Sequence, residues 1–384
     1  MSALPKTGPI DFTAFAVEGY KAFSQPWRLE LGRITVLLGR NNAGKTALCF
    51  APGYFARAFE KDAPAPFPPS WQGIDFGPLQ SVCYRRQSTG LRGALELAGA
   101  TPARRVELGA TAIQERTYEQ FITHLSIQSS DGATTTLDNI EWDKARMAIE
   151  QFSGLSVLSE QVRILRGIRP APERMPMLLG YTPKSIGSFG EYAPMILRVA
   201  GDDGLVAVNK WFVQLGVRLS TAQRGDQFEV LATGPSGEPV NLVDSGAGLA
   251  HILPLVVAVC LAREQPALRC IEQPELHLHP RAHALVAELL LESLKRHQGT
   301  RLLVETHSDV LVLRLRRAIA AGDLKPDDVR IYFVDEGGAG GSSVKPILLN
   351  ARATPDWWPK DVFAESQKEY FALRQELAKR QEHK

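Results

Sequence analysis

Cysteine, net charge and long apolar runs are all scarce in this 384-residue sequence. Its four cysteines show no CxxC spacing, which argues against a disulfide framework and fits a reducing cytoplasm. A net charge of +2 is too small to indicate wholesale nucleic-acid binding. The longest apolar run, residues 252–262, is well short of the roughly 20 residues of a membrane span, and the N-terminus lacks an apolar signal core. We therefore expect a cytoplasmic protein with no membrane segment.

The distribution of apolar residues predicts an α/β protein. Residues 15–39 alternate and then become apolar, which indicates two or three strands leading into a helix. Residues 94–137 form short alternating runs separated by turn residues, as in an antiparallel meander. Residues 142–165 and 204–217 show helical spacing, and beyond Asn241 strand and helix patterns alternate. With 44% hydrophobic residues, the chain can bury a large core.

The strongest motif is "LLGRNNAGKT", residues 37–46. Gly39, Gly44, Lys45 and Thr46 satisfy the GxxxxGK[ST] pattern between a predicted strand and a predicted helix. Glycines let backbone N–H groups surround phosphate oxygens, the lysine reaches the outer phosphates, and the threonine hydroxyl can ligate Mg²⁺. An ordinary glycine-rich turn is the alternative, but the flanking strand and helix favour a phosphate-binding loop.

Two later strands end in polar residues that suit a nucleotide site. "LRCIE" ends in Glu272, from which a carboxylate can hold Mg²⁺. "RLLVETHSD" ends in Glu305, Thr306 and His307, where a histidine could sense the γ-phosphate of a nucleotide. Taken singly, such residues are usually ordinary surface or core polar groups. Their order after a phosphate-binding loop favours the functional interpretation.

Four segments together resemble ABC-type ATPases. "GRNNAGKT", "VDSGAGLAHILPLV", "CIEQPELHLHP" and "LLVETHSD" are similar to the Walker A, signature, Walker B plus D-loop, and switch-histidine segments. The resemblance is nearest to the SMC-like and OLD-like branch, which includes ATPases of bacterial anti-phage systems such as Septu and PARIS. It covers most of the chain and implies an ABC-type P-loop ATPase head, with an antiparallel β lobe and a helical insertion. It also implies that two chains pair head to tail around ATP.

The resemblance also assigns site residues. It implies that Thr46 and Glu272 hold Mg²⁺ and that His307 is the switch residue. Where the family has its catalytic glutamate this chain has Gln273, and a neutral amide can orient water but cannot accept its proton. Either Glu275 or another group assists, or the glutamine is an engineered replacement. The expected ATP-binding residues are Gly39, Arg40, Asn41, Asn42, Ala43, Gly44, Lys45, Thr46 and Ala47, with Ser245, Gly246 and Gly248 approximating the signature.

Four regions are expected along the chain. Residues 1–140 form the N-terminal part of the head with the β meander, and residues 141–225 a mainly helical insertion. Residues 226–350 form the C-terminal part of the head, and residues 351–384 an amphipathic helix.

Several other residues carry weaker signals. His277 and His279 could share a metal, although no further ligand follows at zinc spacing. The Q-loop glutamine of the family would be Gln80 or Gln87. Five arginines could contact the phosphates of DNA or RNA, although solvated faces are the favoured explanation because few aromatic residues are interleaved: Arg85, Arg86, Arg314, Arg316 and Arg317.

The leading functional hypothesis is a cytoplasmic, ATP-driven switch in anti-phage defence. It would bind ATP and Mg²⁺, dimerise on ATP, hydrolyse it slowly and control a separate effector protein, because the segment after His307 is too short for an OLD-like nuclease domain. A non-hydrolysing, ATP-bound assembly scaffold is one alternative. A DNA-repair or DNA-surveillance clamp is another, although such clamps carry long coiled-coil arms.

Overall fold

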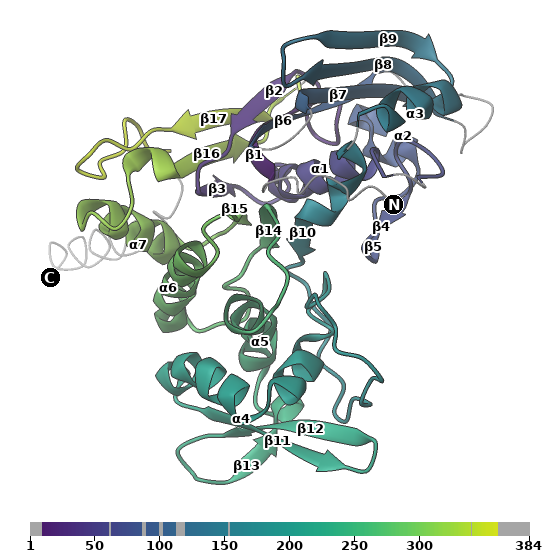
Figure 1. Cartoon of the computed structure of the whole chain (residues 1–384). Helices are drawn as coiled ribbons and strands as arrows, with labels where there is room; N and C mark the ends of the chain where they lie inside the picture. Colours follow the sequence, from purple (N-terminus) through teal and green to yellow (C-terminus); the bar gives the residue numbers. More distant parts are fainter. Residues whose placement is uncertain are drawn as a thin grey trace, which may run out of the picture.

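The computed structural model describes residues 10–60, 63–86, 90–99, 103–112, 120–152, 154–338 and 340–359. Two six-stranded sheets lie on either side of one helix, and a smaller lobe of helices and a short sheet extends from one end (Figure 1). Residues 351–359, expected to begin the C-terminal amphipathic helix, form turns and irregular backbone instead, and the rest of that predicted helix lies outside the described residues.

The first sheet is antiparallel, in the order β2-β1-β6-β7-β8-β9. It includes the meander that the alternating pattern predicted, and so confirms the antiparallel β lobe. The short turn at residues 130–133 connects β8 to β9, so these two strands pair as an antiparallel hairpin. The strands are β1 (Ile10–Glu18), β2 (Trp27–Glu30), β6 (Leu91–Gly99), β7 (Ala103–Ala112), β8 (Gln120–Ser129) and β9 (Thr134–Ile140).

The second sheet is the nucleotide-type sheet, in the order β10-β14-β15-β3-β16-β17. Its first five strands are parallel, and β17 runs antiparallel at one edge. Parallel neighbours end at the same edge, so the polar residues that follow β3, β14 and β15 lie together. The strands are β3 (Ile34–Gly39), β10 (Val162–Leu165), β14 (Leu268–Glu272), β15 (Arg301–Glu305), β16 (Val329–Asp335) and β17 (Ser343–Ile347).

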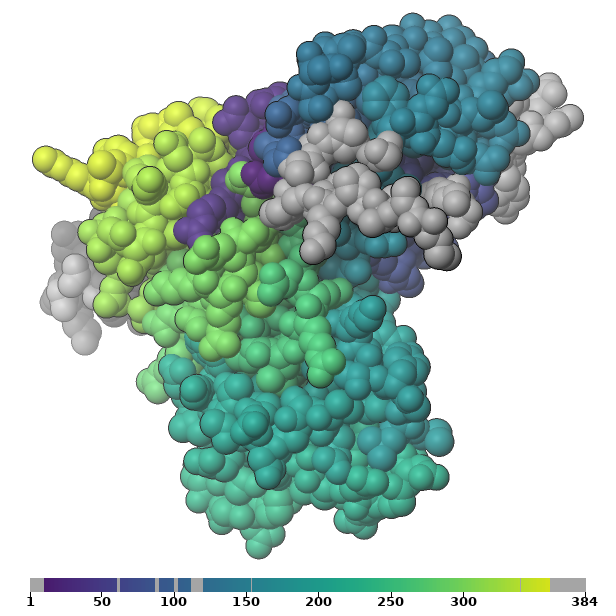
Figure 2. Space-filling view, viewed as in Figure 1, coloured from purple at the N-terminus to yellow at the C-terminus, as the bar shows by residue number. Residues whose placement is uncertain are grey.

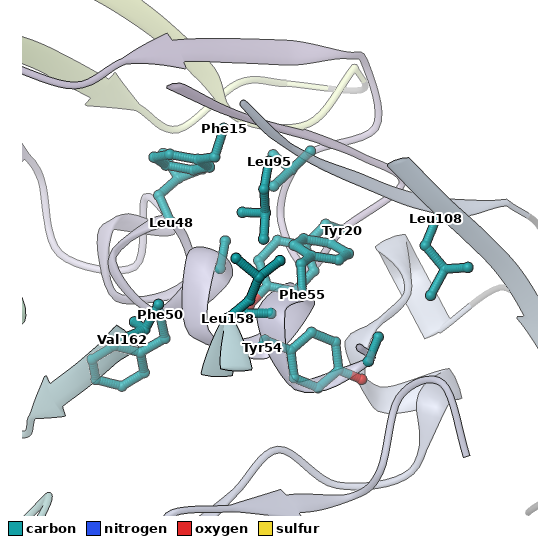
Figure 3. Close-up of a cluster of buried hydrophobic side chains, with 14 of the residues drawn as sticks. Phe15, Tyr20, Leu48, Phe50, Tyr54, Phe55, Leu95, Leu108, Leu158 and Val162 are labelled. Atoms are coloured by element: carbon teal, nitrogen blue, oxygen red, sulfur yellow. The ribbon is translucent and has the colours of Figure 1, made fainter. Parts of the chain in front are cut away.

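Helix α1 (Lys45–Arg57) packs between the two sheets. Its Leu48 and Phe55 are buried with Phe15 and Leu95 from the antiparallel sheet and Val162 from the parallel sheet (Figure 3). The opposite face of the parallel sheet has its own core, into which Val36 and Leu38 point while Leu37 faces α1. This alternation along β3 is what a strand covered on both faces requires.

Helices cover that second face and form the projecting lobe. The lobe consists of α4 (Ala193–Phe212) on the small antiparallel sheet β11 (Arg218–Arg224), β12 (Gln227–Thr233) and β13 (Pro239–Asn241). Figure 2 shows it in teal, projecting from the rest of the molecule. The covering helices are α5 (Ala247–Cys260), α6 (Pro280–Arg296) and α7 (Asp309–Ala320).

The region expected to be a helical insertion is divided between the head and the lobe. Helix α3 (Trp142–Glu150) contacts β8 and β9, so it belongs with the antiparallel sheet. Residues 162–165, expected to be helical, form the edge strand β10 instead, because Val162 and Ile164 are buried where β10 pairs with β14. Only α4 supplies the expected long helix, and it is followed by a hairpin. The proposed domain boundaries stay a prediction.

Short elements complete the secondary structure of the described residues: β4 (Ser70–Trp71), β5 (Ile74–Asp75), α2 (Leu79–Val82) and six 3₁₀ turns. The turns lie at Tyr84–Arg86, Leu155–Val157, Ser159–Gln161, Val213–Leu215, Leu242–Asp244 and Pro326–Asp328. In the described part of the chain, no helix is both long enough and apolar enough to cross a bilayer.

Candidate functional site

The loop between β3 and α1 depends on two glycines. Gly39 has a φ of 146°, and a Cβ added there would lie 2.0 Å from the carbonyl oxygen of Val334 in the neighbouring strand β16. Gly44 has a φ of 94°, and its Cβ would lie 2.9 Å from the ring of Phe23. Any larger residue would therefore be strained and would collide at both positions. The loop is therefore held closely against the sheet and against Phe23.

Lys45 lies inside this loop and is 4% exposed. Its Nζ donates hydrogen bonds to the carbonyl oxygens of Gly39, at 3.0 Å, and Arg40, at 2.6 Å. Burial lowers the pKa of the Lys45 ammonium, and the nearby Glu305 carboxylate partly offsets this effect. A cation held in this way by carbonyl dipoles is available to an anionic ligand that replaces them.

A polar cavity of about 640 Å³ opens in front of the loop. This volume is in the range of small-ligand pockets, which is roughly 300–1,000 Å³. Most of its wall comes from the ends of β3, β14, β15 and β16 and from the turn at residues 81–86. The lining residues are Lys21, Ala22, Asn41, Asn42, Gly44, Lys45, Thr46, Ser81, Cys83, Tyr84, Arg85, Arg86, Gln273, Glu305, His307, Glu336, Gly337, Gly338, Gly341 and Ser342. The structure thus brings the loop, Gln273 and His307 together.

Glu305 is the carboxylate of this cavity, although the sequence analysis gave it no role. The Thr46 hydroxyl donates a hydrogen bond to its Oε2 at 2.8 Å, and the Gln273 side-chain amide donates to its Oε1 at 3.4 Å. Burial raises the pKa of Glu305, and the nearby Glu272 carboxylate raises it further. The signal that could have identified Glu305 is its position at the end of the strand next to β3.

The Glu272 side chain contacts the segment that follows β10. Its Oε2 accepts hydrogen bonds from the backbone N–H of Gly167, at 2.8 Å, and from Nε of Arg166, at 3.1 Å. The Arg166 guanidinium also lies over the ring of Phe50, 5.2 Å from its centroid. Glu272 does not border the cavity. Its assignment as a magnesium ligand stays a prediction.

Glu275 fixes the segment that carries the predicted switch residue. Its Oε1 accepts hydrogen bonds at 2.7 Å from both the Thr306 hydroxyl and the backbone N–H of His307. Glu275 is 6% exposed and does not border the cavity, so here it positions His307. Burial lowers the pKa of His307, and the charge of Lys45 lowers it further, which favours a neutral imidazole facing the cavity.

The predicted signature residues lie away from this cavity. The Ser245 hydroxyl donates to the carbonyl oxygen of Leu242 at 2.7 Å, and α5 begins at Ala247. A Cβ on Gly248 would lie 2.7 Å from the carbonyl oxygen of His277, so this glycine permits close packing within its own chain. Gly246 and Ala247 are exposed. Within one chain, the cavity therefore receives no group from the signature.

His277 and His279, the two candidate metal ligands, each contact another residue of the protein. His277 packs edge-on against His251, with ring centroids 4.6 Å apart, and His279 Nδ1 accepts from the backbone N–H of Arg281 at the start of α6. Among the described residues, no group of three or more His, Cys, Asp or Glu side chains is arranged to hold a metal ion. The arrangement thus offers no support for a zinc site.

The remaining candidates divide between the cavity and the scaffold. Arg85 and Arg86 line the cavity, whereas Arg314 pairs with Glu288 at 2.8 Å. Gln80 lies in α2 but does not border the cavity, and Gln87 lies outside the described residues. Arg316 donates to the Ala353 carbonyl oxygen, and Arg317 is exposed on α7.

The donor groups of the cavity fit ATP with magnesium. Lys45 and the backbone of the loop suit phosphate, and the hydroxyl of Thr46 beside the Glu305 carboxylate provides the hard oxygen ligands that Mg²⁺ prefers. A carboxylate that is 2% exposed also gains from a bound cation, because burial penalises its charged form.

One solved structure has a similar fold. The chain is similar to the Smc head domain with an extended coiled coil bound to the C-terminal domain of ScpA, from Pyrococcus furiosus: they are 10% identical over 95% of this chain and 100% of that one, with a TM-score of 0.51. The fold is similar to that of SMC ATPase heads. The predicted ABC-type head is thereby confirmed at the level of the fold.

Two further SMC heads match less closely. A head bound to the C-winged helix domain of ScpA is 13% identical over 88% of this chain and 98% of that one, with a TM-score of 0.49. The head from Thermotoga maritima is 12% identical over 88% of this chain and 100% of that one, with a TM-score of 0.41.

Sequence comparison matches a shorter part of the chain. Residues 203–314 match the family described as "AAA domain, putative AbiEii toxin, Type IV TA system". This segment runs from the lobe through α5 and the ends of β14 and β15, so it includes Gln273 and His307. No curated protein sequence matches the chain.

One half-buried histidine outside the cavity gives a pH-dependent prediction. Burial lowers the pKa of His297, whose Nε2 lies 3.2 Å from the Val259 carbonyl oxygen. The unfolded chain therefore binds the proton more readily, and the contribution of His297 to stability is full above about pH 6.5 and declines as the pH falls. When the pH is lowered from 7.5 to 5.5, we expect the free energy of unfolding to fall less in His297→Gln than in the unmodified protein.

Urea unfolding at several pH values measures this difference. His279→Gln serves as the control, because His279 is exposed. Identical pH dependence in the unmodified protein and in His297→Gln would contradict the prediction.

Proposed function

We propose that this protein binds Mg·ATP in the cavity, pairs with a second copy of itself around the nucleotide, and hydrolyses ATP slowly. The observation that carries the proposal is the convergence of Lys45, Thr46, Gln273, Glu305 and His307 on one cavity at the carboxyl ends of parallel strands. Ligands of open α/β sheets bind at this edge. In this account ATP acts as a switch for assembly.

Each cavity residue has a task in the proposed site. The Lys45 ammonium exchanges its carbonyl partners for the outer phosphate oxygens, and the loop N–H groups bind the inner phosphates. When bound, Mg²⁺ neutralises phosphate charge. The Gln273 amide orients a water molecule, and the neutral imidazole of His307 contacts the γ-phosphate, held in place by Glu275. None of these steps requires a large movement of the sheet.

Slow turnover follows from the amide of Gln273. Phosphoryl transfer depends chiefly on positioning and electrostatics, so hydrolysis can proceed without a formal base. General-base assistance is commonly worth about 10²–10⁴-fold in rate. A site with an amide in this position should therefore hold ATP for long periods, as a switch requires.

Pairing of two chains would complete the site. Ser245, Gly246 and Gly248 lie away from the cavity of their own chain, and the exposed start of α5 is free to meet the nucleotide of a partner. The positive end of the α5 macrodipole would then face the γ-phosphate. We propose a head-to-tail dimer with two ATP molecules at its interface.

The effector is proposed to be a separate protein. The similar Smc head from Pyrococcus furiosus is bound to a domain of ScpA, so a head of this fold can carry another protein chain. The family matched by residues 203–314 carries the description "AAA domain, putative AbiEii toxin, Type IV TA system". Together with the resemblance to Septu and PARIS ATPases, this supports a role in anti-phage defence.

Ala247→Arg tests the proposed dimer. Ala247 is exposed at the first position of α5, so a long cation there should block the partner without disturbing the cavity or a glycine turn. We expect the ATP-dependent dimer to be lost, by about 100-fold or more in dimerisation affinity, while each monomer keeps its affinity for ATP. Light scattering with and without Mg·ATP measures assembly, and calorimetry measures binding.

Val206→Arg is the matched control. Val206 is an exposed apolar residue of α4, in the lobe, and should accept arginine without loss of the dimer. If the unmodified chain and Ala247→Arg both form the same oligomer with and without ATP, the dimer does not use the signature segment. The constitutive scaffold would then be the better description.

A further inference from the structure

The acid that faces the nucleotide loop comes from a different strand than the sequence indicates. The end of β14 supplies Glu272 and Gln273, and only Gln273 reaches the cavity. The neighbouring strand β15 ends in Glu305, whose two carboxylate oxygens accept from Thr46 and from Gln273. Residues 272 and 305 lie opposite each other in the register of the two strands. The carboxylate beside the threonine hydroxyl therefore belongs to β15.

Glu272 is already engaged on the other side. One of its oxygens accepts from both Gly167 and Arg166, which lie on the segment that follows β10. The same segment reaches the signature helix, because Arg169 donates to the Arg166 carbonyl oxygen and to the carbonyl oxygen of His251 in α5. Glu272 thus connects the sheet to the segment that contacts α5.

We propose that Glu305 is the carboxylate of the magnesium site and that Glu272 is a positioning residue. The inference rests on the proposed binding of Mg·ATP and assigns the metal within that site. Nucleotide-binding loops of this type hold Mg²⁺ through the loop Ser/Thr and one carboxylate close to it. Glu305 Oε2 is 2.8 Å from the Thr46 hydroxyl and satisfies this geometry.

The glutamine at position 273 is then the complement of Glu305. An amide donates a hydrogen bond to the Glu305 carboxylate, whereas a glutamate at this position would place a second negative charge 3.4 Å away. Because Glu305 is 2% exposed, water would screen that repulsion poorly. In this account the acid beside Thr46 comes from β15, and the neutral Gln273 avoids this repulsion while it donates to Glu305.

Magnesium-dependent binding of ATP separates Glu305 from Glu272. Calorimetry measures the affinity for ATP with Mg²⁺ and with EDTA in the unmodified protein, Glu305→Gln and Glu272→Gln. Mg²⁺ should increase the ATP affinity of the unmodified protein. We expect this increase to be about 10- to 100-fold smaller in Glu305→Gln. With EDTA its affinity should stay equal or increase, because the carboxylate no longer repels phosphate. Glu272→Gln should keep the magnesium gain.

A second variant and a direct measurement of metal binding distinguish loss of the metal ligand from local misfolding of the loop. Glu305→Ser removes the same charge with a smaller side chain and should show the same loss, while ATP binding in EDTA reports a folded loop. Electron paramagnetic resonance of Mn²⁺ with ATP gives an independent measure of the metal, with weaker retention expected in both Glu305 variants.

The outcomes distinguish the inference from the function on which it rests. Loss of the magnesium gain in Glu272→Gln, or its retention in both Glu305 variants, would overturn the assignment to Glu305 while leaving ATP binding in place. Absence of ATP binding by the unmodified protein, with or without Mg²⁺, would reject the proposed function itself.

Discussion

Lys45→Ala is expected to remove ATP binding. The Lys45 ammonium is the buried cation of the loop, and its only hydrogen bonds in the described structure go to two loop carbonyls that phosphate can replace. Charge-assisted hydrogen bonds of this kind contribute about 1.5–3 kcal/mol each, so the affinity should fall by about 100-fold or more. Calorimetry with Mg·ATP measures the loss, and ATP-dependent assembly should disappear with it.

Lys210→Ala is the matched control for this change. Lys210 is exposed at the end of α4, remote in sequence from the loop, and its removal should leave ATP affinity unchanged. Circular dichroism should show that both variants are folded. Unchanged ATP affinity in folded Lys45→Ala would mean that the nucleotide binds elsewhere.

Gln273→Glu is expected to accelerate ATP hydrolysis. The new carboxylate can accept the proton of the attacking water, which is commonly worth about 10²–10⁴-fold in rate. Glu305 lies next to it and raises the pKa of the new acid, so we expect an increase of about 100-fold, at the low end of this range. The acceleration should grow as the pH rises from 6 to 9. Steady-state phosphate release across this range measures both effects.

Two controls accompany Gln273→Glu. Gln273→Ala removes the amide without adding a base and should lower the rate. Gln273→Glu combined with Lys45→Ala should be inactive, because the nucleotide no longer binds. If the unmodified protein already hydrolyses ATP at tens per second and Gln273→Glu changes nothing, Gln273 does not occupy the water-activating position.

The sequence predicted those parts of the fold that depend on residues close together in the chain. The glycines of the loop, the alternation of the meander and the strand–helix alternation after Asn241 each act over a few residues, and the structure has all three. The convergence of Lys45 and His307 was also predictable. Parallel strands end at one edge, so polar residues after successive strands meet there.

The errors arose where long-range contacts decide the structure. Residues 162–165 form strand β10 because β14, about 100 residues later, offers a pairing edge to Val162 and Ile164. The pairing partner, rather than the segment itself, sets the conformation there.

The site shows the same limit. Motif order assigned the metal to Glu272, because that residue ends the strand that precedes "QPE". Which acid faces Thr46 depends on the contact of Glu272 with Arg166 and Gly167, more than 100 residues apart in the sequence. No spacing rule contains that contact, so the choice between Glu272 and Glu305 depends on the three-dimensional arrangement.

The nucleotide retained by the protein tests the central claim most directly. The unmodified chain is mixed with Mg·ATP, passed rapidly through a desalting column and denatured with acid, and the released nucleotide is identified and counted. A slow switch that holds ATP should release about one molecule per chain, as ATP rather than ADP, and Lys45→Ala should release none. Recovery of ADP alone, or of no nucleotide from the unmodified chain, would contradict the account.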